Sequence, residues 1–402
     1  MRLRWTTRRS AIGCAALVAT ATLVAACSSG TSPTAGPSAA NTPSGKATPA
    51  AHFTTDTNTQ YAQLVAAAKA EGEVVVSGPR GLPEFQKVIA DGFTAKYGIK
   101  VVYSGLGGSK VLKKMLATQP GQPYPYDVLV GGYDTLFANL DPENALTDLD
   151  SQIVLKEDTD LSKWSGGQVP WDNSGHTSLG FLNQSGQYFY VDTSKAKLSD
   201  IKSYRDLLQP RWRDQILLAD DPRTDGTVNA VVALFLQSKG LGQNFVRQFL
   251  TTQKPTIAES DEEVDSDLKS PSFLMCVCNN SQGTELTKEH PNFAKLDPHK
   301  VTEGTTTTSS FANVAVPTRV KHPNAAKLYL NWLLSEQTGL AAAKATGLPS
   351  ARVDVPRDFL TAQSIPDPSW PNGANESALT AKDQAQLLAL EILGPLPAGS
   401  SS

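Results

Sequence analysis

Residues 73–115 read EVVVSGPRGLPEFQKVIADGFTAKYGIKVVYSGLGGSKVLKKM, and this stretch decides the fold. Two short β-branched runs, Glu73–Val76 and Ile99–Tyr103, alternate with spans of helical spacing, which indicates βαβ units and a parallel sheet. A glycine-rich loop follows each run, at Ser77–Gly81 and at Ser104–Ser109. Such loops lie at the carboxyl ends of parallel strands, where open α/β sheets bind ligands. The stretch therefore predicts a binding cleft.

The same α/β pattern continues along the chain. In the helix predicted from Leu82 to Tyr97, apolar residues at spacings of three and four form one stripe that should pack on the sheet. A third strand, Tyr126–Val130, ends in another glycine loop, and a second α/β series runs from Tyr204 to His290. The extended segments around 177–192 and 311–316 are expected to cross between two lobes, and the last helices, through 381–392, to complete the first lobe.

Length and charge limit the possible functions. A chain of 402 residues is expected to fold as more than one domain. Its formal net charge of -3 does not indicate a nucleic-acid-binding protein, which would be expected to carry a positive charge.

The N-terminus predicts export. Four arginines precede the short apolar segment Ala11–Ala26, so residues 1–26 read as a signal peptide. The sequence Leu23-Val24-Ala25-Ala26-Cys27 resembles the lipobox of bacterial lipoproteins, in which the cysteine is lipidated. A twin-arginine route through Arg8-Arg9 stays open. Residues 27–58, rich in Ser, Thr, Pro and Ala, are expected to be a flexible tether.

Catalytic and metal motifs are missing from the sequence. It contains no Gly-x-Ser-x-Gly elbow, no His-Glu-x-x-His and no complete phosphate loop. Lys110 stands where a dinucleotide fingerprint beginning at Gly105 needs its third glycine. Cys276 and Cys278 lie in an apolar run, and we expect buried free thiols rather than a disulfide or a metal site. We expect no enzyme, no cofactor and no resident metal.

The polar loops instead favour binding. Gly107-Gly108-Ser109 and Gly226-Thr227 each precede a predicted helix, and helix N-termini attract anions. Arg80 and Arg223 lie in the adjoining loops and could contact a carboxylate or a phosphate. The alternative is that both arginines form ion pairs, for example Arg223 with Asp220, Asp221 or Asp225.

Several collinear segments resemble bacterial extracellular solute-binding proteins of ABC importers, in the group that includes ferric-iron, phosphonate and thiamine binders. The resemblance covers nearly all of the chain after the tether. The segments that carry it are Leu64–Glu73, Tyr126–Val130, Ile201–Arg213, Asp221–Arg223 and His322–Ser335.

The resemblance implies a periplasmic-binding-protein-like clamp of two α/β lobes with a hinge of at least two crossing segments. We expect lobe I at 59–182 and 310–402 and lobe II at 183–309. It also implies delivery of a small-molecule solute to an ABC permease and its ATPase. Together with the lipobox, we expect a monomer that is lipid-anchored on the outer face of the cytoplasmic membrane. A secreted enzyme and a ligand sensor are weaker alternatives.

The ligand is expected between the lobes and to be small, polar and anionic. Lobe I should contribute Arg80, Gly107, Gly108, Ser109 and Tyr133, and lobe II Tyr190, Arg223, Gly226, Thr227, Asn279, Asn280 and Ser281. Ferric binders of the group place adjacent tyrosines where this chain has Asn279–Gln282. A ferric or ferric-chelate receptor, with Tyr188 and Tyr190 as phenol donors, is therefore the alternative.

Overall fold

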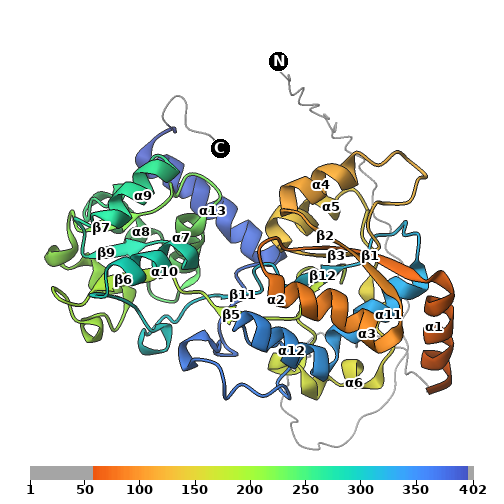
Figure 1. The fold of residues 1–402 in the computed structure, drawn as a ribbon. Helices are drawn as coiled ribbons and strands as arrows, with labels where there is room; N and C mark the ends of the chain where they lie inside the picture. Colours follow the sequence, from red (N-terminus) through yellow and green to blue (C-terminus); the bar gives the residue numbers. More distant parts are fainter. Residues whose placement is uncertain (1–57, 397–402) are drawn as a thin grey trace, which may run out of the picture. The chain divides into compact units, whose positions relative to one another are not determined.

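The computed structural model describes residues 58–396, and in this range two mixed sheets carry the fold (Figure 1). The first sheet has the order β2-β1-β3-β12-β4. Its strands are β1 (Glu73–Gly78), β2 (Lys100–Gly105), β3 (Val128–Gly131), β4 (Ser178–Gly180) and β12 (Asn313–Ala315). β1 pairs in parallel with β2 and β3, as the opening stretch predicts, while β12 runs antiparallel to β3 and β4.

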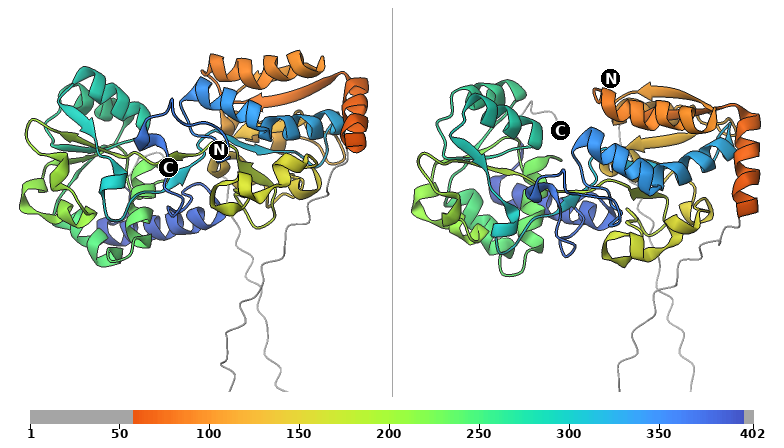
Figure 2. Two further views of the ribbon diagram at one scale, coloured as in Figure 1. Left: turned by 90° about the horizontal axis from the view of Figure 1, so that it is seen from below. Right: turned by 60° about the horizontal axis from the view of Figure 1, so that its bottom comes forward.

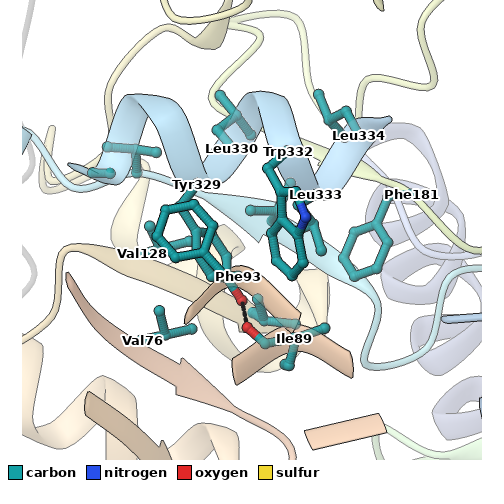
Figure 3. Close-up of a cluster of buried hydrophobic side chains, with 14 of the residues drawn as sticks. Val76, Ile89, Phe93, Val128, Phe181, Tyr329, Leu330, Trp332, Leu333 and Leu334 are labelled. Atoms are coloured by element: carbon teal, nitrogen blue, oxygen red, sulfur yellow. Dashed lines mark hydrogen bonds between the residues drawn. The ribbon is translucent and has the colours of Figure 1, made fainter. Parts of the chain in front are cut away.

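We call this sheet and its helices the first lobe. The helices are α1 (Asn58–Glu71), α2 (Pro83–Gln86), α3 (Gly92–Tyr97), α4 (Gly108–Leu116), α5 (Ala138–Leu140), α6 (Lys156–Thr159), α11 (Pro323–Leu334) and α12 (Glu336–Thr346). The predicted apolar stripe is buried, with Phe85, Ile89 and Phe93 in the core. Figure 3 shows Tyr329 and Trp332 of α11 packed around Phe93, with the Tyr329 hydroxyl donating to the carbonyl of Ile89.

The second sheet has the order β10-β6-β9-β7-β8, and we call it and its helices the second lobe. Its strands are β6 (Phe189–Asp192), β7 (Ile216–Leu218), β8 (Thr256–Ile257), β9 (Met275–Val277) and β10 (Phe293–Lys295). Its helices are α7 (Thr227–Gln237), α8 (Gly242–Thr251), α9 (Asp261–Lys269) and α10 (Asn280–Glu289). Parallel pairing of β7 with β8 and β9 directs their following loops to one edge.

The last helix, α13 (Glu376–Leu393), corrects one expectation. The sequence assigned it to the first lobe, but α13 packs on α7 and α8, and Figure 2 shows it beside these helices in both views. Ala385 and Leu388 lie in the core of the second lobe, whereas Leu379 packs against residues of the first. Periodicity identifies the apolar face of a helix, but not the surface that covers it.

Three segments connect the sheets, in agreement with the expected hinge. The chain leaves the first sheet through β5 (Gln184–Ser185) and returns through β11 (Thr307–Thr308), and these two strands pair antiparallel. The third segment joins α12 to α13 and lies along β11, where Thr307 donates to the carbonyl of Pro371 and accepts from the amide of Gly373.

The cysteine expectation was wrong. The structure joins Cys276 and Cys278 by a disulfide, with their Cα atoms 5.6 Å apart. This separation lies within the usual range for disulfides.

The predicted signal peptide and the lipidation site Cys27 lie outside the described residues, and so does all of the predicted tether except Asn58, where α1 begins. Between residues 58 and 396, no helix combines the length and the apolar character that crossing a membrane requires.

Candidate ligand-binding site

Residues from both lobes line one cavity of about 390 Å³. Hydroxyl, amide and charged side chains dominate its wall. They are Asp134, Thr135, Gln184, Ser185, Gln187, Tyr188, Asp225, Thr227, Asn279, Asn280, Thr308, Ser310 and Lys382. We call this space the central cavity. Its wall offers many hydrogen-bond donors and acceptors, so it suits a polar ligand.

A second cavity, of about 490 Å³, adjoins it along the first lobe. Both cavities share Asp134, Thr135, Thr308, Ser310 and Ala374 as lining residues. The second one extends to Arg80, Gly107, Gly108 and Tyr133, at the ends of β1, β2 and β3. We call it the lobe I cavity. Its position agrees with a site at the carboxyl ends of parallel strands.

Eight of the predicted site residues therefore line one of the two cavities. Arg80, Gly107, Gly108 and Tyr133 line the lobe I cavity, and Gly226, Thr227, Asn279 and Asn280 line the central cavity. The other four, Ser109, Tyr190, Arg223 and Ser281, line neither.

The N-terminus of α4 keeps its backbone donors free of a side-chain cap. Gly107 is the N-cap residue and forms no capping hydrogen bond through a side chain. A Cβ on Gly108 would lie 2.8 Å from the Thr135 hydroxyl, so glycine lets this turn approach the loop after β3. A helix terminus of this kind favours an anion by roughly 0.3–1 kcal/mol.

The N-terminus of α7 is already occupied, which corrects its predicted role. The Asp220 carboxylate accepts from the backbone amides of Thr227 and Val228, at 3.0 and 2.8 Å. Burial raises the pKa of Asp220 to about 6, against the opposing effect of these two hydrogen bonds. A solute anion would have to compete with this internal carboxylate.

Arg223 is also engaged, as the ion-pair alternative predicted. Its guanidinium pairs with Asp221 and donates to the carbonyl oxygens of Gly394 and Pro395, at 3.3 and 2.9 Å. The side chain is only 10% exposed, and its hydrogen bond to Asp221 raises its pKa. Arg223 therefore fixes the chain after α13 and has no free donor directed at the cavities.

Tyr190 and Ser281 need the same correction. The Tyr190 ring is fully buried beneath α10, where a Cβ on Gly283 would overlap it, and burial raises the pKa of its hydroxyl. Ser281 lies in the first turn of α10, where its amide donates to the Asn279 side chain in a capping box, and its side chain is exposed.

Comparison with known proteins identifies the family. The family model described as bacterial extracellular solute-binding protein matches residues 88–371, about 70% of the chain. The chain belongs to this family. It is thus an exported solute-binding protein whose partners are a small-molecule solute and an ABC-type permease. A search of curated proteins found no match.

Solved structures of other solute-binding proteins share the fold. One is the Trichodesmium protein IdiA (FutA) in complex with iron and citrate, with 14% identity and a TM-score of 0.59. Others are iron-bound HitA from Pseudomonas aeruginosa (19%, 0.57) and the spermidine/putrescine-binding protein PotD from Streptococcus pneumoniae (16%, 0.57). Each match covers 80% of this chain and 99% of the other. At these identities the likeness shows the fold alone.

Sequence reasoning missed several lining residues of this solute-binding protein. Asp134 and Asp225 stand next to predicted residues in the same loops, so their position after β3 and before α7 was a usable signal. Lys382 carried no such signal, because it lies on α13, which the sequence assigned to the other lobe.

Proposed function

We propose that this solute-binding protein captures a small polar solute in the two adjoining cavities and releases it to a membrane permease driven by an ATPase. The observation that carries the proposal is a polar cavity lined by both lobes. The protein works as a monomer, without catalysis, and a lipid on Cys27 holds it at the outer face of the cytoplasmic membrane.

An anionic group of the solute binds at the N-terminus of α4 beside Arg80. Among the described hydrogen bonds and ion pairs, no carboxylate competes for either of these two features. The other two predicted anion-binding features are occupied, because Asp220 accepts from the N-terminus of α7 and Asp221 pairs with Arg223. Arg80 is exposed at the end of β1, so its side chain can close over a bound anion.

Solute binding closes the clamp about the three crossing segments. A ligand shifts an equilibrium between open and closed states only through contacts that differ between them. The central cavity meets this condition, because Thr135 and Ser310 on one side and Thr227 and Asn280 on the other line the same space. A solute reaching both walls favours the closed state.

A thermal-shift screen of the mature protein tests the proposal, with sugar phosphates, phosphonates, dicarboxylates, polyamines, thiamine and ferric citrate as probes. Arg80→Gln should weaken an anionic hit about tenfold or more, because a charged hydrogen bond contributes roughly 1.5–3 kcal/mol. Lys110→Gln, an exposed charge of α4 that lines neither cavity, is the control and should bind as wild type does. Hits that are indifferent to Arg80 contradict this placement of the anion.

A ferric or ferric-chelate receptor is the second candidate, favoured by iron in the structures of two fold neighbours. Tyr133 and Tyr188 line the cavities, but burial raises the pKa of both phenols, and the Tyr188 hydroxyl pairs with Thr306 at 3.0 Å. Ferric iron as cargo would have to overcome both effects to obtain phenolate ligands. Metal analysis of the purified protein and a visible charge-transfer band would support this candidate.

A further inference from the structure

One ion pair connects the two walls of the central cavity. Lys382 of α13 donates through Nζ to Oδ2 of Asp134, and both side chains line the cavity. They are 14% and 22% exposed, so water screens the pair less than it would a surface pair. Among the ion pairs of residues 58–396, this one joins the lobes, and the others lie within a lobe.

The backbone on each side of the pair is fixed. Asp134 lies in the helical turn that directly follows β3. The carbonyl of Lys382 accepts from the side-chain amide of Asn229 on α7, at 3.1 Å, and the start of α13 is tied to the first lobe, where the Glu376 amide donates to the carbonyl of Asp172. The two side chains, rather than the backbone, can therefore change partners.

The two side chains differ in how easily each can move out of the ion pair. Aspartate is short and stays where β3 places it, whereas the lysine side chain has four rotatable carbons and can turn toward solvent. Asp134 Oδ1 is also buried and has no hydrogen-bond partner within the described chain. The carboxylate thus has room for a further donor, and Lys382 is the partner that can be replaced.

The charges of the cavity favour a cationic replacement. Among the described lining residues, the central cavity has two carboxylates, Asp134 and Asp225, and one ammonium, that of Lys382. While Lys382 pairs with Asp134, one carboxylate stays uncompensated. If the lysine moves out, the cavity gains a second free negative charge, which a cationic group of the solute can neutralise.

We propose that Lys382 is an internal competitor for Asp134, and that the solute carries a cationic nitrogen group that displaces it. This inference rests on the proposed function of the same cavities. Since Asp134 lines both cavities, a solute with its anionic end at Arg80 can present its cationic end to Asp134. The site is therefore specific for an amphoteric solute, and Asp134 and Lys382 determine that specificity.

Matched probes with and without an amine test the inference by calorimetry. The pairs are 4-aminobutyrate with butyrate, and 2-aminoethyl phosphate with ethyl phosphate. Lys382→Met keeps the length of the side chain and removes its charge. If lysine occupies Asp134 in nine of ten molecules, its removal should tighten binding of the aminated probe about tenfold. Asp134→Asn, of nearly equal shape, should abolish the preference for the aminated probe.

Controls separate this inference from its alternatives. Asp383→Asn changes an exposed neighbour on α13 and should bind as wild type does, and melting curves report whether each variant folds. A Lys382→Met protein that binds aminated probes no more tightly than wild type overturns the inference. The inference is also overturned if Lys382→Met and Asp134→Asn each weaken binding of the aminated probe and of its amine-free partner equally. That result would mean that the ion pair only holds the two lobes together. If the wild-type protein binds solutes from the screen but does not prefer the aminated member of each probe pair, the inference fails while the proposed function stands.

Discussion

Gly283 shows how a single missing side chain positions the site. It lies where α10 crosses the Tyr190 ring, and a Cβ there would overlap the ring. Gly283→Ala should lower the free energy of unfolding by about 1–3 kcal/mol, because it overpacks a buried contact. It should also weaken solute binding, since α10 carries Asn279 and Asn280. Urea denaturation and the thermal-shift screen measure the two effects.

The partner residue provides the control. The double variant Gly283→Ala/Tyr190→Ala removes the ring that the new methyl group meets. It should therefore lower the free energy of unfolding by less than the sum of the two single variants. Additive losses would mean that Tyr190 is not the obstacle.

For single residues, the sequence predicted the positions of site residues better than their hydrogen-bond and ion-pair partners. The predicted glycines marked the starts of both α4 and α7, although α4 already begins at Gly108, within the predicted loop Gly107-Gly108-Ser109. The occupation of the second terminus by Asp220 depends on a carboxylate folding back over seven residues. Whether such a carboxylate turns inward or faces water depends on tertiary packing, which residue type and spacing do not encode.

Among the elements, α13 is the one whose surroundings the sequence did not predict. Leu388 is 6% exposed in the core of the second lobe, whereas its neighbour Leu387 is 67% exposed. Leu388→Ala should therefore lower stability by about 2–5 kcal/mol, the usual cost of truncating a buried leucine. Leu387→Ala is the matched control on the same helix and should change stability by no more than about 0.5 kcal/mol. Chemical denaturation followed by tryptophan fluorescence compares them. Equal losses would mean that α13 is not packed as described.

The helical span from Pro83 to Tyr97, which consists of α2, a π-helical turn and α3, shows the opposite case. Its apolar stripe was predicted from spacing alone and is buried, because an amphipathic helix beside its own strand has only one sheet on which to pack. The last helix is separated from its packing partners α7 and α8 by well over a hundred residues. Local periodicity therefore predicts elements near in the chain and fails for the contact that brings Lys382 to the site.

In the whole molecule, the three crossing segments link two lobes that each have their own hydrophobic core clusters, so the hinge sets how far the lobes can open. The third segment depends on Gly373, since a Cβ there would lie 2.8 Å from the Thr306 hydroxyl and 3.2 Å from the carbonyl oxygen of Thr307. Gly373→Ala should push this segment off β11 and break both of its backbone hydrogen bonds to Thr307.

The expected result is a third segment that no longer pairs with β11, and hence a larger radius of gyration for the ligand-free variant in small-angle X-ray scattering. Scattering suits this test because Gly373 also lines the central cavity, which would confound a binding measurement. Gly175→Ala, where a Cβ would make only an ordinary 3.5 Å contact with Thr177, is the matched control and should scatter as wild type does. If the Gly373→Ala protein has a lower melting temperature but the scattering curve of wild type, the third segment stabilises the fold without limiting its opening.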